Sequence, residues 1–252
     1  MMLGTVADAA GAQSPKVEAL SLVQTMIPNE PCYQTSGSYP QLDEHCVVAN
    51  EVNESIAKVF RNDERKWIAW GMSFKRRVDS KCPGEYEILN RPTTTFLDNK
   101  HQEFPSTYES ASSRVISVLS TIQTSAPSGA GIGGHFVSIT IDPSNSQTVE
   151  LKQLFAKSSR AYAFIQELVI KRCVELRGSD DCSGAAQILP PKSSSFRYFA
   201  LTTKGLAVGI NGEVVSSWAW ETTVPYSSLR PYLSTFGKWL VAGVRFPRLD
   251  QR

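Results

Sequence analysis

The stretch from Phe196 to Val224 alternates short apolar runs with residues that favour tight turns. One run ends at Lys204-Gly205 and the next at Asn211-Gly212, and glycine accepts the positive φ that hairpin turns require. The runs themselves are rich in β-branched and aromatic residues, which favour strands. The sequence therefore predicts a meander of short antiparallel strands, followed after Pro225 by a short helix with Ser227 as its N-cap.

Upstream of the meander, the spacing of apolar residues predicts two main helices and several strands. Helical spacing runs from Val48 to Phe60, with an expected end near Arg61-Asn62, and again from Ala161 to Leu176. An extended strand is expected at 19–27. Apolar and polar residues alternate, as in half-buried strands, in the segments 85–90, 93–97, 115–123 and 136–141. We therefore predict an α+β fold in which the two helices pack on an antiparallel sheet and the meander supplies its C-terminal strands.

No internal repeat or linker divides the chain, so residues 19–252 are predicted to form a single domain. Residues 1–18 are interpreted either as a flexible tail or as the remnant of a signal peptide. The string Ala-Gly-Ala-Gln-Ser resembles a cleavage region, but the basic start and the long apolar middle of a signal peptide are missing. Both interpretations stay open.

Composition and charge exclude some classes of function. The 252 residues are 41% hydrophobic and 20% charged, which is typical of a chain that buries a core of normal size. No apolar run approaches eighteen residues, so we predict no membrane span. Trp67, Trp70 and Phe74 precede a basic run, but the net charge is only +2 and acidic residues flank them. We therefore predict a solvated strand end with buried tryptophans and no nucleic-acid partner.

The five cysteines favour disulfides over a metal site. They include no Cys-x-x-Cys pair, and with three histidines they give no zinc-ligand spacing, so no metal is expected. Cys173 and Cys182 flank a turn-forming stretch at the end of a predicted helix, which suits a local disulfide. Cys32 and Cys46 bracket a loop and form a second candidate pair, which leaves Cys82 over. These pairs favour an extracytoplasmic protein, and five reduced thiols in a cytosolic protein are the alternative.

A glycine-rich stretch before His135 resembles a nucleotide-binding fingerprint in its spacing. Gly129, Gly131 and Gly134 match the motif, but a strand follows them where a helix would have to receive the pyrophosphate. We therefore expect no nucleotide and no other cofactor. Two roles for His135 stay open: a structural histidine that hydrogen-bonds across the glycine-rich turn, or a general base oriented by Asp142 or Glu150.

Trp218 and Trp220 stand two residues apart just after the predicted Asn-Gly hairpin, so both side chains are expected on one face. One interpretation places them in the core. The other makes them an exposed aromatic anchor for a partner, the kind of residue that dominates protein interfaces. We take Trp218, Trp220 and His135 as the candidate binding residues.

The order of several short motifs resembles that of a known family. The matching positions are Phe199, Leu201, Thr202, Gly205, Leu206, Val224, Pro225, Tyr226 and Leu229, with Gly133-Gly134-His135, Leu151 to Phe155, Tyr39-Pro40 and Asn53-x-x-Ile56 upstream. This pattern, over most of residues 25–235, resembles the RsiV-type family, which includes the lysozyme-binding outer domain of an anti-sigma factor and a secreted mycobacterial immunogenic antigen. Trp218 lies in a loop where that family usually carries Pro and Gly.

The resemblance implies a non-catalytic, secreted or periplasmic recognition module. Its partner would be an envelope protein, a wall-active protein such as lysozyme, or a host factor. An alternative is an envelope hydrolase that acts on glycan or peptidoglycan through a site around His135, although no established catalytic motif accompanies that histidine. A structural role in the envelope is a third possibility.

Overall fold

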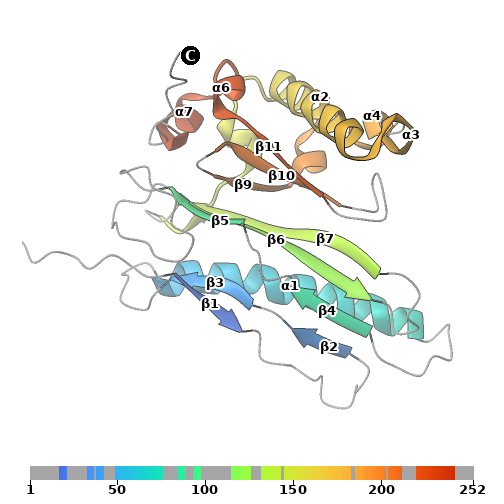
Figure 1. Cartoon of the computed structure of the whole chain (residues 1–252). Coiled ribbons are helices and arrows are strands. Elements are labelled where there is room, and N and C mark those ends of the chain that lie inside the picture. Colours follow the sequence, from blue (N-terminus) through green and yellow to red (C-terminus); the bar gives the residue numbers. More distant parts are fainter. Residues whose placement is uncertain are drawn as a thin grey trace, which may run out of the picture.

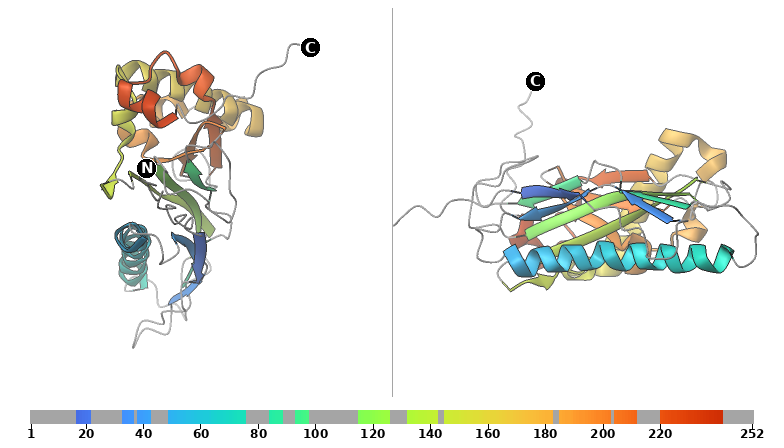
Figure 2. Two further views of the ribbon diagram at one scale, coloured as in Figure 1. Left: turned by 90° about the vertical axis from the view of Figure 1, so that its left-hand side faces the viewer. Right: turned by 90° about the horizontal axis from the view of Figure 1, so that it is seen from below.

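The computed structural model describes residues 17–21, 33–36, 38–42, 49–75, 84–88, 93–97, 115–125, 132–142, 145–182, 185–202, 204–211 and 220–241. These residues form an α+β fold, as predicted. Figure 1 shows its layers: α1 covers one face of a large sheet, a small sheet lies on the other face, and the C-terminal helices cover the small sheet. The left view of Figure 2, in which α1 is seen end-on, shows α1 and the C-terminal helices on opposite sides of the strands.

The large sheet has the strand order β2-β4-β6-β7-β8, with β5 also paired to β6. Its strands are β2 (Tyr33–Ser36), β4 (Gly84–Ile88), β5 (Thr93–Leu97), β6 (Val115–Ser125), β7 (Ile132–Asp142) and β8 (Gln147–Thr148). The long strands β6 and β7 are antiparallel over almost their whole length, and β5 and β4 pair with successive halves of β6. The pair β2–β4 is parallel, whereas β1 (Val17–Ser21) and β3 (Ser38–Leu42) form a separate antiparallel pair.

The predicted C-terminal meander is confirmed, but it forms a separate small sheet and does not supply the last strands of the large one. It consists of β9 (Tyr198–Leu201), β10 (Leu206–Ile210) and β11 (Trp220–Val224), which are antiparallel in the order β11-β10-β9. Thr202 closes the first hairpin, because its backbone N–H and its hydroxyl both donate to the carbonyl of Gly205. A side chain at Gly205 would run into the carbonyl of Val224, so only glycine fits this turn.

The helices flank the two sheets on opposite sides. α1 (Ala49–Lys75) packs on the large sheet and α2 (Ser158–Arg177) on the small sheet. The short helices are η1 (Leu151–Leu154), α3 (Ser179–Cys182), α4 (Ala185–Ile188), η2 (Ser193–Phe196), α6 (Tyr226–Leu229) and α7 (Thr235–Val241). The short helix predicted after the meander is confirmed as α6, but its N-cap is Pro225 and not Ser227.

α1 is longer than the sequence pattern predicted. It continues thirteen residues beyond Asn62 to Lys75, so the predicted end near Arg61-Asn62 is wrong. The strand end predicted around the two tryptophans is wrong for the same reason. Trp67 is buried in the sixth turn of this helix, whereas Trp70 is 51% exposed. Residues 63–66, which follow the predicted end, are all charged and include neither Gly nor Pro, so nothing in them ends a helix.

The two faces of the small sheet carry side chains of different size. Large apolar residues of β9 to β11 point toward α2 and form the main core with it: Phe199, Leu201, Leu206, Val208, Ile210, Trp220 and Val224. The opposite face carries Ala200, Ala207 and Gly209, with the half-buried Tyr198 at the start of β9, and the two alanines pack against Leu119 and Phe136 of the large sheet. A Cβ at Gly209 would lie only 2.6 Å from Cγ of Phe136. Small residues therefore allow the two sheets to approach closely.

Serine hydroxyls of the large sheet bind the free edge of β9. The N–H of Leu201 donates to Oγ of Ser117 at 2.9 Å, and the N–H of Phe199 donates to Oγ of Ser138 at 3.2 Å. The Ser117 hydroxyl also shares a buried hydrogen bond of 2.7 Å with that of Thr140. Because an unpaired buried N–H is costly, these hydroxyls replace the neighbouring strand that β9 lacks on this side.

Ser117→Ala should lower the free energy of unfolding by about 1–3 kcal/mol, because it leaves the Leu201 N–H and the Thr140 hydroxyl without this buried partner. Urea unfolding followed by circular dichroism measures the change. Ser138→Ala is the matched control. It should have a smaller effect, since Ser138 is partly exposed and water can replace its hydroxyl. A Ser117→Ala cost below that of Ser138→Ala would contradict this role.

Candidate functional site

His135 and Asp63 form a polar pair between the large sheet and α1. The Nε2 atom of His135 lies 2.6 Å from Oδ2 of Asp63, and the two side chains are 23% and 24% exposed. Asp63 continues the helix face that carries Phe60 and Trp67, so a carboxylate stands at a position where the neighbouring turns bury aromatic rings. A carboxylate that binds one ring nitrogen fixes the orientation of the histidine ring. A structural histidine and a general base both require such a fixed orientation.

Neither of the predicted orienting carboxylates contacts His135. Asp142 is seven residues further along β7, so its side chain points to the opposite face, where it accepts a hydrogen bond of 3.3 Å from Nδ2 of Asn145. Glu150 pairs instead with Lys152 at 2.6 Å. The predicted orienting role of Asp142 or Glu150 is therefore wrong, and Asp63 occupies that place.

Trp220 lies in the core and not on the surface. It starts β11 opposite Ile210, is 7% exposed, and belongs to the cluster around α2. The exposed position expected for it as an anchor is therefore wrong. Trp220 and Val224 are four residues apart in β11, so their side chains lie on the same face of the strand, which points toward α2. Trp218, Cys32, Cys46 and Cys82 lie outside the described residues.

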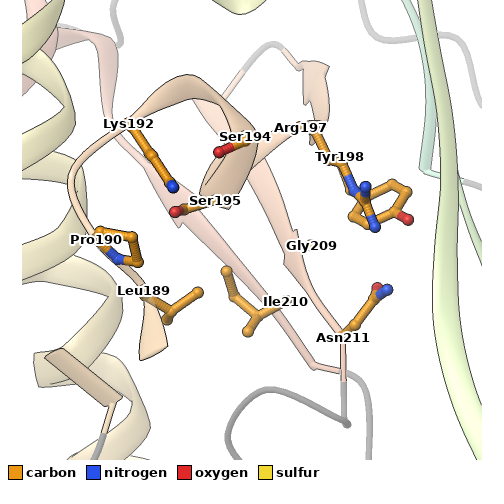
Figure 3. A pocket seen from close by; sticks show the side chains of 10 residues that line it. All are labelled: Leu189, Pro190, Lys192, Ser194, Ser195, Arg197, Tyr198, Gly209, Ile210 and Asn211. Carbon is orange, nitrogen blue, oxygen red and sulfur yellow. The ribbon is translucent and has the colours of Figure 1, made fainter. Parts of the chain in front are cut away.

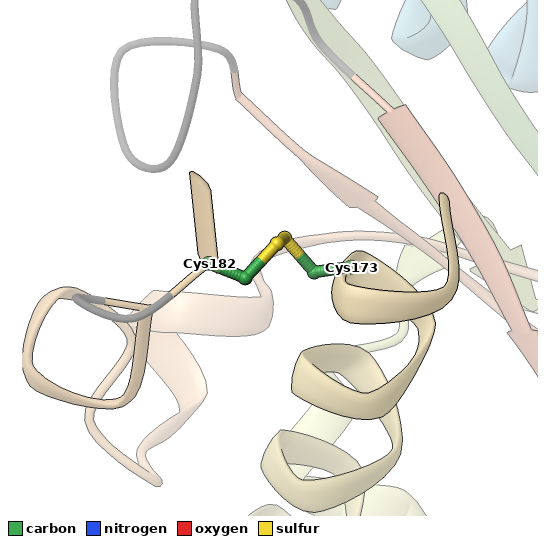
Figure 4. Close-up of a disulfide and its surroundings, with 2 residues drawn as sticks. All are labelled: Cys173 and Cys182. Atoms are coloured by element: carbon green, nitrogen blue, oxygen red, sulfur yellow. A yellow bond between two sulfur atoms is a disulfide. The ribbon is translucent and has the colours of Figure 1, made fainter. Parts of the chain in front are cut away.

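The predicted disulfide between Cys173 and Cys182 is present (Figure 4). It joins the last turn of α2 to α3, its Cα atoms are 6.0 Å apart, and both cysteines are buried. The turn that Gly178 makes at the end of α2, with φ of 91°, brings the second cysteine back against the helix. Disulfides persist in oxidising compartments, so this bond is compatible with an extracytoplasmic protein.

The sequence interpretation missed an exposed aromatic residue on α7. Trp239 is 44% exposed and stacks on Phe236, with ring centroids 6.0 Å apart. α7 begins after Ser234, whose hydroxyl accepts a hydrogen bond of 2.9 Å from the N–H of Gly237. Gly237 in turn packs against the backbone of Leu154, where a side chain would not fit. The serine before an apolar run of helical spacing is the signal that predicts this helix.

Burial controls the titration of two tyrosines near these helices. Removal from water raises the pKa of Tyr226, the tyrosine of the Val-Pro-Tyr motif, far above its usual value. Burial also raises the pKa of Tyr162 on α2. Both phenols therefore stay neutral at physiological pH, and Tyr226 acts as an anchor that fixes α6 in the core.

The described residues contain no group of three or more potential metal ligands, and none of their helices is long and apolar enough to cross a membrane.

Comparison with solved structures identifies the fold. The structure is similar to a DUF3298 family protein from Pseudomonas aeruginosa PAO1, at a TM-score of 0.55 and 10% identity, over 90% of this chain and 98% of that one. A DUF3298 family member from Bacteroides fragilis NCTC 9343 gives a TM-score of 0.55 and 8% identity, over 92% and 98%. This chain has the fold of these DUF3298 proteins. No family model matches the sequence, and no curated protein matches it either.

The likeness spans nearly the full length of both of these structures. At such low identity the likeness concerns the fold alone, and function has to be argued from the residues of this chain.

Removal of the Cys173–Cys182 disulfide should lower the free energy of unfolding by about 2–3 kcal/mol, because the bond closes a loop of about ten residues and restricts the unfolded chain. The double replacement by alanine, compared in urea with the oxidised native protein, measures this cost. Non-reducing peptide mapping of the freshly isolated native protein should recover the bridged peptide. Recovery of both cysteines as free thiols would contradict the bond.

Proposed function

We propose that this chain is a non-catalytic extracytoplasmic recognition module that binds a wall-active protein of the lysozyme type. Three features support the proposal. The motif order resembles that of the RsiV-type family, the Cys173–Cys182 disulfide suits an oxidising compartment, and an aromatic surface is exposed on α7.

The exposure of Trp239 is the observation that carries this proposal. Nearly all large apolar side chains in the described part of the chain are buried or half-buried, whereas Trp239 leaves almost half of its surface to solvent. Its ring is held by the stack on Phe236, and Phe236 packs on the main core. Tyr232 stacks on Phe164 of α2 at 5.3 Å and packs on the same core. We call Trp239 and Phe236, which both lie on α7, the aromatic surface.

Such a surface suits a protein interface. Tryptophan and tyrosine contribute most to binding when their rings are rigid and lose water on contact, because little conformational entropy is lost. The stacking on Phe236 and Phe164 supplies that rigidity before a partner arrives. A partner that covers Trp239 would bury apolar area that is otherwise exposed to water.

Trp239→Ala should weaken binding of the oxidised protein to lysozyme by about tenfold or more, as loss of an interface tryptophan does. Biolayer interferometry measures the affinity. Trp70→Ala is the matched control, since Trp70 is as exposed but lies on α1, on the opposite side of the molecule. It should leave the affinity unchanged.

Equal losses in the two variants, or no binding of lysozyme by the native protein, would contradict the proposal as stated. A pull-down from envelope and host extracts then identifies any other partner.

A hydrolase with a site around His135 is the second candidate, and the pair with Asp63 favours it. In a general-base arrangement a carboxylate orients the imidazole that accepts the proton, and Asp63 lies 2.6 Å from His135 as that arrangement requires. Peptidoglycan or glycan hydrolysis that His135→Ala abolishes without loss of folding would favour the enzyme over the recognition module.

A further inference from the structure

A cavity of about 290 Å³ opens beside η2, at the edge of the small sheet. Figure 3 shows the side chains around it, which come from three places in the chain. Lys192, Ser195 and Arg197 come from η2 and its flanks, Tyr198 from the start of β9, and Ile210 and Asn211 from the end of β10. The cavity shares no residue with the aromatic surface.

The polar side chains that line this cavity are all able to donate a hydrogen bond. Lys192 and Arg197 bring two positive charges, and no acidic residue stands among the described residues that line it. The guanidinium of Arg197 lies over the ring of Tyr198, 4.7 Å from the centroid, which restrains the flexible arginine. An arginine held in this way presents its planar set of N–H groups without first losing conformational freedom.

Asn211 adds an oriented donor. Its Oδ1 atom accepts a hydrogen bond of 3.1 Å from the N–H of Phe136 on β7. This bond fixes the amide, so Nδ2 is the end that remains to donate. Figure 3 shows the Asn211 amide at the rim of the cavity, facing the end of the Arg197 side chain. The close packing of the two sheets thereby sets the direction of a side chain in the cavity.

Part of the remaining wall is apolar. Leu189, Pro190 and Ile210 line the side of the cavity away from Arg197. The volume is close to the lower limit for small-molecule sites, and it exceeds what a bare inorganic anion fills. A ligand therefore has to combine one negative group with a small organic body.

We propose that this cavity binds the carboxylate of a small organic acid, of the size of an acidic monosaccharide or of the last two residues of a peptide. Arg197 binds the carboxylate oxygens through charge-assisted hydrogen bonds, and Nδ2 of Asn211 donates to one of them. Lys192, across the cavity beside Ser195 and Pro190, adds a second positive charge. The body of the ligand packs against Ile210 and Pro190. This site goes beyond the proposed protein-binding function and does not depend on it.

Isothermal titration of the full chain with two matched pairs of probes tests the site. N-acetylmuramic acid is compared with neutral N-acetylglucosamine, and N-acetyl-alanyl-alanine with its C-terminal amide. We expect saturable binding of at least one carboxylate and at least tenfold weaker binding of its neutral partner. The pair that responds distinguishes a sugar acid from a peptide end.

Asn211→Asp is the sharpest variant, because the carboxylate can still accept the Phe136 N–H while it places a negative charge in the cavity. It should reduce the affinity of the responding carboxylate more than tenfold, and Arg197→Gln should do the same. Lys171→Gln, which removes an exposed charge from α2, is the control and should change nothing. Thermal unfolding verifies that each variant is folded.

Binding of the neutral probe as tightly as the acid, tighter binding of inorganic phosphate than of both acids, or full affinity in Asn211→Asp would each overturn the proposal. The proposal would also be overturned if none of the four probes saturates at 10 mM. A dissociation constant of 10 mM corresponds to about 2.7 kcal/mol of binding free energy.

Discussion

The close contact between the two sheets is the constraint on which the rest of the structure depends. β9 is an edge strand whose outward N–H groups need partners, and the large sheet supplies them through Ser117 and Ser138. These hydroxyls reach β9 where the facing residues Ala200, Ala207 and Gly209 are small, with Gly209 against the ring of Phe136. The large residues of the same strands are thereby directed to α2, so one alternation of small and large side chains determines both interfaces.

Much of this architecture could be predicted, because it depends on patterns within short segments of the sequence. The meander, α2 and the Cys173–Cys182 disulfide follow from turn residues, helical spacing and a short cysteine separation, none of which depends on distant residues. The length of α1 could not be predicted in the same way. Asp63 stands where an apolar residue would continue the helical pattern, and only the fold brings His135 of β7 to it. The predicted helix end was wrong because the helix continues through a charged residue, Asp63, whose partner His135 is distant in the sequence.

In the candidate sites, too, the features that depend on distant residues could not be predicted. Trp220 was predicted as a possible anchor because a tryptophan after a hairpin has no local feature that separates core from surface, and its pairing with Ile210 buries it. The cavity at η2 is assembled from residues up to 22 positions apart in the sequence, and the orientation of Asn211 depends on β7. Both the proposed carboxylate site and the aromatic surface of α7 are therefore products of tertiary packing. The proposed protein-binding role and the proposed carboxylate site use different parts of the C-terminal half of the fold.

The most direct test of the sheet contact is the free energy of unfolding of Gly209→Ala, measured in urea beside Gly133→Ala. Both glycines lie in strands, and because both replacements are glycine to alanine they have similar effects on the unfolded chain. A Cβ at Gly133 meets only Oγ1 of Thr124 at 3.5 Å, an ordinary contact, whereas a Cβ at Gly209 meets the Phe136 ring at 2.6 Å. The close contact predicts a loss of about 1–3 kcal/mol for Gly209→Ala and a change within about 0.5 kcal/mol for Gly133→Ala. Equal stability of the two variants would contradict it.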